Sequence, residues 1–348
     1  MKNNREFSAI VPVAGSGTRL RPHTRTFPKV LLTVGDKPII GHILDDISKA
    51  GIKKIYMVIG SMGDKIRTYV AGKYPKLDVT FIKQAEPRGL GHAIWLTRAQ
   101  VKGPALVMLG DTIVSADLKK FLNAGGDAIA VRKVADPGRF GVVETKKGRI
   151  VNMVEKPRNP ASNQAIVGIY AFKDTKPLFL SLDRLVKSGR TTGGEIQLTD
   201  ALLLMLKGGH QFQPVTIDGW YDCGKPETLL ETNRYILKKK NPVSKHGAGP
   251  ASRAPGCVIV GPVYISPRAR VANSIIGPYA SIGDGAVVDH SIVSDSIINE
   301  KAVIMNMNLT KSLVGPNAVI IGRREQINIG ESSGCNTRKR VSHNSAIR

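Results

Sequence analysis

The sequence predicts an α/β fold, in which a mainly parallel sheet with flanking helices is followed by a left-handed parallel β-helix. Three patterns in the 348 residues lead to this expectation. Short β-branched runs alternate with amphipathic stretches from Ser8 to about Leu237, which is typical of βα units. A stretch rich in charge, proline and glycine follows at 238–256, and beyond it apolar residues recur every five or six positions, as in a hexapeptide repeat.

The expected strands of the first domain, residues 1–237, are short and apolar. They cover residues 9–14, 54–59, 79–82 and 105–109, with helical segments between them. One helix begins at Pro38, a residue suited to a first helical position, and stops at Gly51. In such Rossmann-like sheets ligands bind beyond the carboxyl ends of the strands. Asp111, which closely follows the last of these strands, is therefore well placed for a site.

A hairpin interrupts the alternation at residues 141–157. Two apolar-rich strands are joined there by a turn that contains Lys146, Lys147 and Gly148. We expect this hairpin to form a lid or the second half of a cleft.

The second domain is expected at residues 257–322, after a linker at 238–256. Its repeating apolar positions should point inward and the alanines that follow several of them should fit at tight corners. The apolar positions are Ile265, Val271, Ile276, Ile282, Val288, Val293, Ile298, Ile304, Leu309, Val314 and Ile320, and the alanines are Ala269, Ala280, Ala286, Ala302 and Ala318. At three hexads per coil this length gives about three to four coils. A small antiparallel sandwich would explain the short strands but not their steady spacing. The basic tail at 323–348 is expected to be mostly unstructured.

The charge and the cysteines limit the classes of function. A net charge of +24 favours phosphorylated small molecules, nucleic acid or an anionic membrane surface as partners. The basic residues are spread along the chain rather than gathered on one arm with aromatic residues, which disfavours nucleic-acid binding. The three cysteines form no CxxC pair, and no apolar run is long enough to span a bilayer. We therefore expect a cytoplasmic protein that does not enter the membrane.

A glycine loop follows the first strand and is surrounded by basic residues. It reads Gly15-Ser16-Gly17-Thr18-Arg19, and Arg21, His23 and Lys29 come soon after it. Glycines let backbone N–H groups approach phosphate oxygens, and the cations add charge. The loop is neither a Walker motif nor a dinucleotide fingerprint, because it lacks both the Lys-Ser/Thr pair and the third glycine. It suggests a polyphosphate ligand of another kind.

Seven ordered motifs between residues 8 and 235 resemble those of the sugar-nucleotide pyrophosphorylases, especially the glucose-1-phosphate thymidylyltransferases and uridylyltransferases. They are the GSGTRLRP segment with Pro28-Lys29, the QAEPRGLGHA segment from Gln84, Gly110-Asp111, the FGVVE segment from Phe140, Glu155-Lys156-Pro157, Gly194-Glu195 through Thr199-Asp200, and the WYDCG segment from Trp220. Ala14 and Thr112 depart from the thymidylyltransferase pattern, which usually has glycine and asparagine there. The choice between a thymidine and a uridine nucleotide stays open.

The resemblance implies that the chain joins dTTP or UTP to a sugar 1-phosphate and releases pyrophosphate. Glucose 1-phosphate is the sugar phosphate that the resemblance favours. It implies Mg²⁺ held by Asp111 and Asp222, since Mg²⁺ prefers carboxylate and phosphate oxygens. It also assigns three groups of residues. Those on the nucleotide are Gly15, Gly17, Thr18, Arg19, Gln84 and Gly89, with the Gln84 amide on the pyrimidine edge. Those on the sugar phosphate are Gly141, Glu155, Lys156 and Glu195. Those in catalysis are Arg19, Lys29, Asp111 and Lys156.

Two alternative functions stay open for the chain. Hexapeptide domains also occur in acyl-CoA-dependent enzymes, and His290 is the one candidate base for an acyltransferase in this domain. Otherwise the domain would serve assembly, as similar domains do in related pyrophosphorylases, and we expect a homo-oligomer formed through it. A basic nucleic-acid-binding protein is the other alternative, and it would show a steep loss of affinity with salt.

Overall fold

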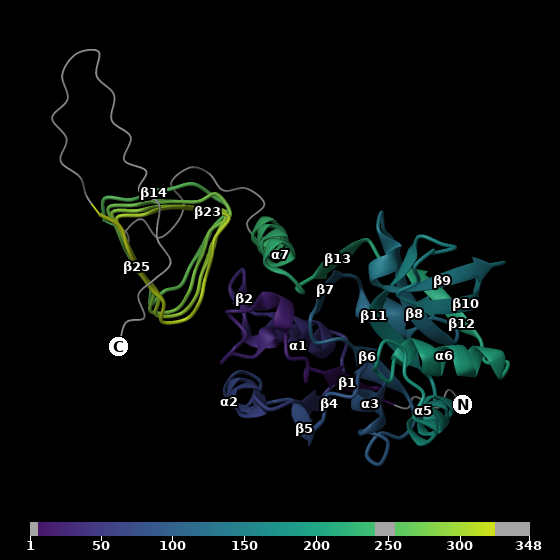
Figure 1. The fold of residues 1–348 in the computed structure, drawn as a ribbon. Helices are drawn as coiled ribbons and strands as arrows, with labels where there is room; N and C mark the ends of the chain where they lie inside the picture. Colours follow the sequence, from purple (N-terminus) through teal and green to yellow (C-terminus); the bar gives the residue numbers. More distant parts are fainter. Residues whose placement is uncertain (1–5, 241–254, 324–348) are drawn as a thin grey trace, which may run out of the picture.

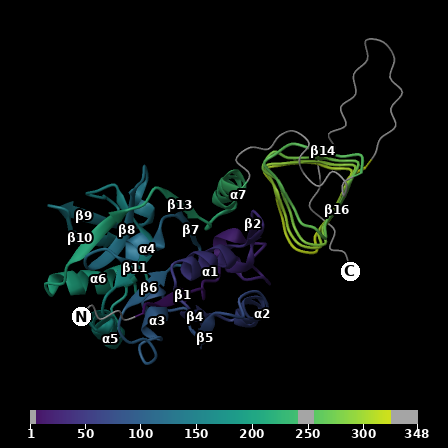
Figure 2. The same cartoon turned by 180° about the vertical axis from the view of Figure 1, so that it is seen from behind.

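The computed structural model describes residues 6–240 and 255–323. Figure 1 shows a large α/β domain and, beside it, a triangular stack of short strands. Helix α7 lies between the two parts, and Figure 2 shows the same arrangement from behind. An α/β domain followed by a parallel β-helix is thus confirmed.

In the described part of the chain, nine strands form the main sheet, with β10-β9-β11-β6-β1-β4-β5 in order. β8 also pairs with β11, and β12 pairs with β8. The strands are β1 (Ser8–Pro12), β4 (Lys54–Ile59), β5 (Asp78–Lys83), β6 (Ala105–Met108), β8 (Asp127–Lys133), β9 (Gly141–Lys146), β10 (Arg149–Glu155), β11 (Gln164–Phe172) and β12 (Phe212–Thr216). Two small sheets pair β2 (Thr33–Val34) with β3 (Lys37–Pro38), and β7 (Thr112–Ser115) with β13 (Gly219–Asp222).

The sheet is Rossmann-like with a parallel centre, as predicted, and β11 adds antiparallel pairs because it enters in the opposite direction. Strands β6, β1, β4 and β5 are parallel to one another, as expected for βα units. β11 follows directly after the β9–β10 hairpin and runs antiparallel to both β6 and β8. The expected strands are present with small shifts: 54–59 is unchanged, while the first strand begins one residue earlier and ends two residues earlier than expected.

Helices cover both faces of the sheet, and alternate residues of its central strands face them. Ala9 and Val11 belong to one apolar cluster, and Ile10 between them belongs to the other. The helices are α1 (Ile39–Lys49), α2 (Gly63–Lys73), α3 (Leu90–Trp95), α4 (Leu118–Leu122), α5 (Lys176–Ser188), α6 (Leu198–Lys207) and α7 (Pro226–Lys240), with short 3₁₀ turns η1 (Thr18–Leu20), η2 (Lys29–Leu31) and η3 (Pro137–Arg139). Burial on both faces explains why these strands are continuously apolar.

The expected hairpin is present as β9 and β10. The two strands pair antiparallel from Gly141 opposite Glu155 to Lys146 opposite Arg149. Lys147 and Gly148 form the turn, with φ of 50° and 75°. Two central residues with positive φ match the right-handed twist of the strands, and glycine takes this conformation readily.

The second domain consists of three parallel sheets of four short strands each, which is consistent with a left-handed β-helix. The strands are β14 (Val258–Ile259), β15 (Tyr264–Ile265), β16 (Arg270–Ala272), β17 (Ile275–Ile276), β18 (Ser281–Ile282), β19 (Val287–Asp289), β20 (Ile292–Ser294), β21 (Ile297–Ile298), β22 (Val303–Met305), β23 (Asn308–Thr310), β24 (Leu313–Val314) and β25 (Val319–Ile321). Four coils agree with the expected three to four.

The coils are shorter than the expected three full hexads. Val258 pairs with Ile275, Ile275 with Ile292 and Ile292 with Asn308, so successive coils contribute 17, 17 and 16 residues. Residues such as Asn273 and Asn306 take a left-handed conformation, with φ of 48° and 53°. The predicted apolar positions and alanines all belong to one cluster inside the coils.

The boundary between the domains differs from the predicted linker. Helix α7 continues through Lys240, three residues into the stretch that was expected to be irregular. The remaining linker residues 241–254, and residues 324–348 of the expected tail, lie outside the described residues. In the described ranges no helix is both long and apolar enough to cross a membrane.

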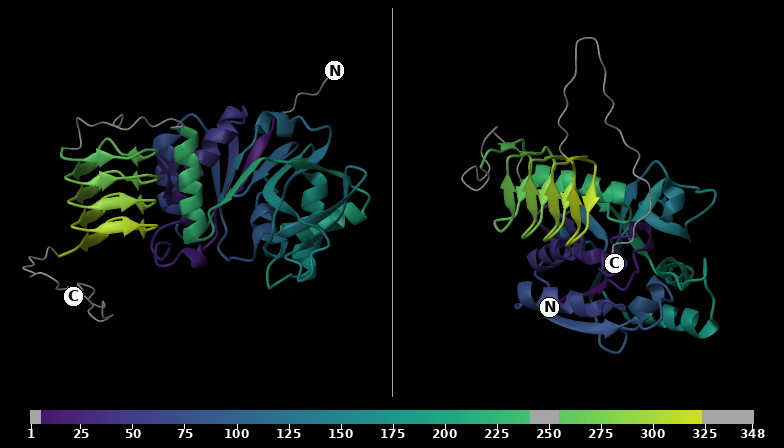
Figure 3. Two further views of the ribbon diagram at one scale, coloured as in Figure 1. Left: turned by 90° about the horizontal axis from the view of Figure 1, so that it is seen from above. Right: turned by 60° about the vertical axis from the view of Figure 1, so that its left-hand side comes forward.

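One sheet of the β-helix packs against the α/β domain. Its strands are β15, β18, β21 and β24, and Figure 3 shows α7 running alongside the coils. Ile297 on β21 belongs to the same apolar cluster as β1 and α1, and Leu313 on β24 packs against that cluster. The two domains therefore share part of one hydrophobic core.

We predict that Ile297→Ala destabilises the protein much more than Ile292→Ala. Ile297 is fully buried between the domains, whereas Ile292 is 41% exposed on another sheet of the same coils. Removing a buried isoleucine side chain costs about 2 to 5 kcal/mol, because it leaves a cavity as well as losing apolar contact. Thermal unfolding of the two variants and the parent measures this. Equal melting temperatures for both variants would show that the domains do not pack through Ile297.

Candidate active site

The site lies at the carboxyl ends of the parallel strands, where several loops meet. The glycine loop follows β1, Gln84 follows β5, and Asp111 follows β6. Parallel strands bring these ends to the same edge of the sheet. Two adjoining cavities open there, with volumes of about 350 Å³ and about 170 Å³. We call them the first and the second cavity.

The first cavity is lined by the glycine loop and by the segment after β5. Gly15, Lys29, Gln84 and Gly89 all contribute to its wall. Gly17 has a φ of 62°, and a Cβ added there would lie 3.0 Å from Cβ of Lys29. The glycine therefore allows the loop to pack closely against the residue that supplies the cation.

Lys29 and Asp111 form an ion pair at the inner end of the first cavity. Lys29 Nζ lies 2.7 Å from Asp111 Oδ2, and the lysine itself is buried. The short turn η2 begins at Lys29, directly after Pro28. The ion pair keeps the Lys29 ammonium group beside the Asp111 carboxylate.

Asp222 is brought next to Asp111 by the pairing of β13 with β7. Asp222 stands opposite Thr112 in that antiparallel pair, and the Cys223 N–H donates to the Asp111 carbonyl over 3.1 Å. Burial, and then the charge of Asp111, raise the pKa of Asp222, while Lys29 and the nearby arginines act in the opposite direction. Asp222 and Asp111 are thus neighbouring carboxylates whose mutual repulsion a bound cation would relieve.

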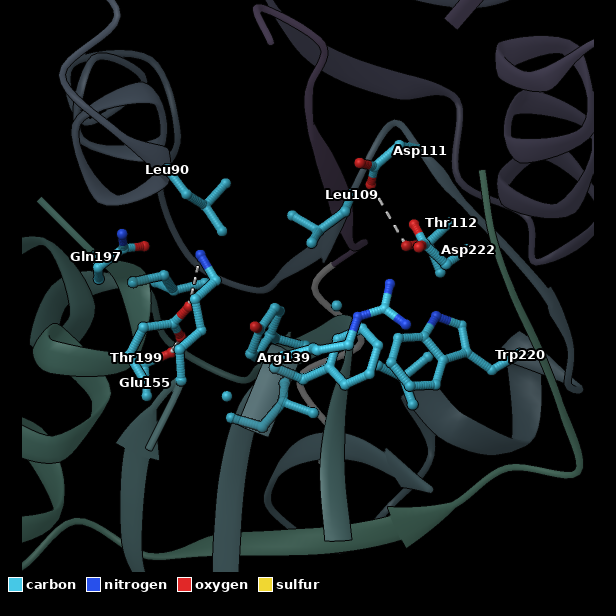
Figure 4. A pocket seen from close by; sticks show the side chains of 18 of the residues that line it. Leu90, Leu109, Asp111, Thr112, Arg139, Glu155, Gln197, Thr199, Trp220 and Asp222 are labelled. Atoms are coloured by element: carbon cyan, nitrogen blue, oxygen red, sulfur yellow. Dashed lines mark hydrogen bonds and ion pairs between the residues drawn. The ribbon is translucent and has the colours of Figure 1, made fainter. Parts of the chain in front are cut away.

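The second cavity is lined by the β9–β10 hairpin and by residues that follow it. Glu155 Oε2 accepts a hydrogen bond from the Thr199 hydroxyl over 2.7 Å, and its Oε1 lies 3.4 Å from Lys156 Nζ. Lys156 has a φ of 42°, and its N–H donates to the Phe140 carbonyl. A Cβ at Gly141 would lie 3.1 Å from Glu155 Oε2, so a side chain there would crowd that carboxylate. Figure 4 shows Glu155 and Thr199 on one wall, with Asp111 and Asp222 across the cavity.

The two cavities meet at Asp111. This residue lines both of them, as do Leu90 and Leu109. Asp222 lines the second cavity only. A ligand in each cavity would therefore come together at one carboxylate.

Some residues lie elsewhere in the site than their predicted roles suggest. Arg19, expected on the nucleotide, lines the second cavity, and Glu195, expected on the sugar phosphate, lines the first. Gly17 and Thr18 do not belong to the wall of either cavity, although they shape the loop behind it.

The Gln84 side chain is held at the wall of the first cavity. It is 7% exposed, and its Nε2 lies 3.2 Å from the Gly89 carbonyl and 3.1 Å from His92 Nδ1. His92 thus supports the glutamine. Gly89 has a φ of 103°, and a Cβ there would lie 2.7 Å from the Ile196 carbonyl. That close approach seats the segment containing Glu195 over the first cavity.

Sequence reasoning missed Arg139 and the role of Trp220. Arg139 lies over the Phe140 ring, with 5.4 Å between the guanidinium carbon and the ring centroid, and Phe140 packs edge-on against Trp220. Figure 4 shows the Arg139 guanidinium next to Trp220 in the second cavity. Trp220 Nε1 is buried without a hydrogen-bond partner. The position of Arg139 directly before the Phe140-Gly141 motif is the one signal that could have indicated it.

Asp111 and Asp222 are the candidate metal ligands, and they form a minimal set. In residues 6–240 and 255–323, no three His, Cys, Asp or Glu side chains form a cluster able to hold a metal ion on their own. Asp111 and Asp222 offer two carboxylates, and Mg²⁺ typically takes one or two carboxylates together with substrate phosphates. The donor set therefore fits Mg²⁺ when a phosphate ligand is also bound.

Comparisons with known proteins agree with this geometry. Residues 8–239 match the Nucleotidyl transferase family. The glucose-1-phosphate thymidylyltransferase of Streptomyces antibioticus is 31% identical over 92% of this chain and 99% of its own length, and that of Streptomyces griseus is 32% identical over 92% and 93%. A solved structure of UDP-glucose pyrophosphorylase complexed with UDP-glucose superposes with a TM-score of 0.60 at 27% identity, covering 68% of this chain and 100% of that one. The chain belongs to the nucleotidyl transferase family.

Proposed function

We propose that the chain joins a nucleoside triphosphate, dTTP or UTP, to a sugar 1-phosphate, with glucose 1-phosphate as the first candidate, and releases pyrophosphate. The main support is the pair of cavities that meet at Asp111. The printed names of the relatives point to the same reaction, since they describe a thymidylyltransferase for glucose 1-phosphate and a UDP-glucose pyrophosphorylase. The triphosphate would occupy the first cavity and the sugar phosphate the second.

In this reaction a phosphate oxygen of the sugar attacks the α-phosphorus in line. A new P–O bond forms, the bond from the α-phosphorus to the bridging oxygen breaks, and pyrophosphate leaves with that electron pair. No covalent enzyme intermediate is required. The protein therefore acts by holding two anionic substrates together and by stabilising the charge that moves between them.

The cationic side chains of the site lie close to where the phosphate groups of the two substrates would bind. Lys29, paired with Asp111, would contact the triphosphate, and Lys156 would contact the sugar phosphate. Arg19 lines the second cavity, so we place it between the substrates rather than only on the nucleotide. Glu155, fixed by Thr199, is positioned to accept hydrogen bonds from sugar hydroxyls.

We propose that Asp111 and Asp222 hold Mg²⁺ together with phosphate oxygens of the substrates. Bound there, the ion would neutralise phosphate charge and help align the α-phosphate. Gln84 would read the pyrimidine edge from the wall of the first cavity, where it is already held by Gly89 and His92. Lys29 keeps one oxygen of Asp111 occupied and so orients that carboxylate.

The acyltransferase alternative has weaker support. His290 Nδ1 lies 2.9 Å from Asp289 Oδ2, but the histidine side chain is 43% exposed at a coil corner and lines neither cavity. An exposed pair of this kind does not by itself form a substrate site.

We also propose a cytoplasmic homo-oligomer assembled through the C-terminal domain. The described cysteines, Cys223 and Cys257, are free thiols, as suits a reducing compartment. Val258, Ile275 and Ile292 stand in register on the outer face of one sheet and are each at least 40% exposed. Such an apolar stripe is suited to contact with a second copy.

The reaction is tested by measuring pyrophosphate release from a matrix of triphosphates and sugar 1-phosphates with Mg²⁺. We expect release only when a pyrimidine triphosphate and a sugar 1-phosphate are both present, because attack on the α-phosphorus needs the second substrate. Release from the triphosphate alone would indicate hydrolysis, and no release from any pair would contradict the proposed function.

Lys156→Ala should impair use of the sugar phosphate and leave triphosphate binding nearly unchanged. A charge-assisted contact to phosphate is stronger than a neutral one, so kcat/KM for the sugar phosphate should fall roughly tenfold to a hundredfold. Lys146→Ala is the matched control, because Lys146 lies on the same hairpin but at its exposed outer end.

Calorimetry of triphosphate binding and kinetics of the sugar phosphate separate the two halves of the site. A large loss of triphosphate affinity in Lys156→Ala, with an unchanged KM for the sugar phosphate, would mean that the two cavities have been assigned the wrong way round.

A further inference from the structure

Helix α7 begins at Pro226, shortly after Asp222, and makes several of the contacts between the two domains. The turn between them is tight, since a Cβ added at Gly224 would lie 2.9 Å from Asp222 Oδ1. Tyr221, next to Asp222 on β13, stacks on Tyr235 of α7 with ring centroids 3.8 Å apart. The direction of the Asp222 carboxylate therefore depends on where α7 lies.

A single buried side chain connects α7 to the β-helix. Asn233 is 1% exposed, and its Oδ1 accepts from the Ser281 hydroxyl over 2.8 Å and from the Gly35 N–H over 2.7 Å. Its Nδ2 donates to the Tyr279 carbonyl over 3.1 Å. These bonds join three separate segments at one point: α7, the turn between β2 and β3, and the second coil. A buried amide with partners on both its oxygen and its nitrogen favours one arrangement of its neighbours.

Two neighbouring interactions strengthen the same contact. Arg234, the next residue on α7, pairs with Asp295 of the β-helix through both ends of its guanidinium. Ile297, on the same sheet as Ser281, is buried in the core of the α/β domain. Hydrogen bonds, charge and apolar packing thus hold α7 against one face of the coils.

The β-helix also contacts the segment between Arg19 and Lys29, two of the cationic residues of the site. A Cβ added at Gly315, in the last coil, would lie 3.3 Å from His23 Nδ1. His23 stands between Arg19 and Lys29 in the chain. The segment that follows the glycine loop and the helix that follows Asp222 therefore both contact the β-helix.

We propose that Asn233 is a positioning residue for the reaction: docked on Ser281 of the β-helix, it fixes α7 and so the orientation of the Asp222 carboxylate. The β-helix then takes part in catalysis by holding a carboxylate in place, in addition to any role in assembly. This inference rests on the proposed function for its catalytic consequence. The chain of contacts from Ser281 through Asn233 and α7 to Tyr221 and Asp222 is present whether or not the proposed function is correct.

The test compares Ser281→Ala with Ser291→Ala in the full chain. Both serines are almost fully buried in the coils, but the Ser291 hydroxyl donates to the Asp289 carbonyl and accepts from the Met307 N–H, away from the α/β domain. Both variants should lower the melting temperature. Only Ser281→Ala should raise the Mg²⁺ concentration needed for half-maximal pyrophosphate release, by about three- to tenfold, the effect of losing one ordinary hydrogen bond.

A second measurement does not require activity or metal. Hydrogen–deuterium exchange of the peptide that contains Trp220 to Thr228 should become faster in Ser281→Ala and stay unchanged in Ser291→Ala. Asn233→Ala should give a larger increase, and the double variant Asn233→Ala/Ser281→Ala should match Asn233→Ala alone, because Ser281 acts through Asn233.

Unchanged exchange and unchanged Mg²⁺ dependence in Ser281→Ala, with a lowered melting temperature, would overturn the proposal and leave Ser281 as a residue for stability alone. If the parent protein releases no pyrophosphate, the proposed function fails, while the exchange comparison still decides whether the β-helix positions the segment around Asp222.

Discussion

The site depends on one constraint: the pairing of β7 with β13 places Asp222 beside Asp111. The two residues are far apart in the sequence, and like charges repel when buried near each other. Lys29 offsets part of that repulsion through its ion pair with Asp111, and burial with the remaining repulsion keeps the pKa of Asp222 raised. The two carboxylates can therefore lie side by side in the folded protein and still offer oxygen ligands to a divalent cation. The glycine loop, the hairpin and α7 all take their places around this pair.

The division into two cavities follows from how the surrounding segments pack. The Ile196 N–H donates to the Arg88 carbonyl, and the Gly91 N–H donates to the Ile196 carbonyl, so the segment before α6 lies against the segment before α3. The β9–β10 hairpin forms the opposite boundary and contributes Glu155 and Lys156. Glycines stand where two segments come too close for a side chain, as at Gly89 and Gly141. The cavities can therefore be small and adjacent, as the meeting of two phosphorylated substrates requires.

Much of this could be predicted from the sequence, because the signals are local. The strand at 54–59, the hairpin turn at Lys147-Gly148 and the repeat of apolar residues inside the coils each follow from periodicity or turn chemistry. The antiparallel part of the sheet could not be predicted, since the direction of β11 depends on its pairing with β6 and β8, which are distant from it in the chain. Residues from separate motifs, such as Asp111, Glu155 and Asp222, came together at one site, as the ordered motifs implied. The place of Arg139 in the site, and the cavities that Arg19 and Glu195 line, are set by the direction of each side chain. The spacing of residues in the sequence does not give that direction. The contact of Asn233 with Ser281 is also a tertiary contact between domains, and nothing in either segment indicates it.

The central claim is that Asp111 and Asp222 act as one unit where the two cavities meet. The most direct test is a double-mutant cycle on kcat/KM for pyrophosphate release, with Asp111→Asn, Asp222→Asn and the double variant. Residues that hold one ion together are strongly non-additive, because the first substitution already removes what the second would remove. The account predicts that the double variant is about as active as the weaker single variant. Losses that multiply across the two substitutions would show that the carboxylates act independently and would contradict it.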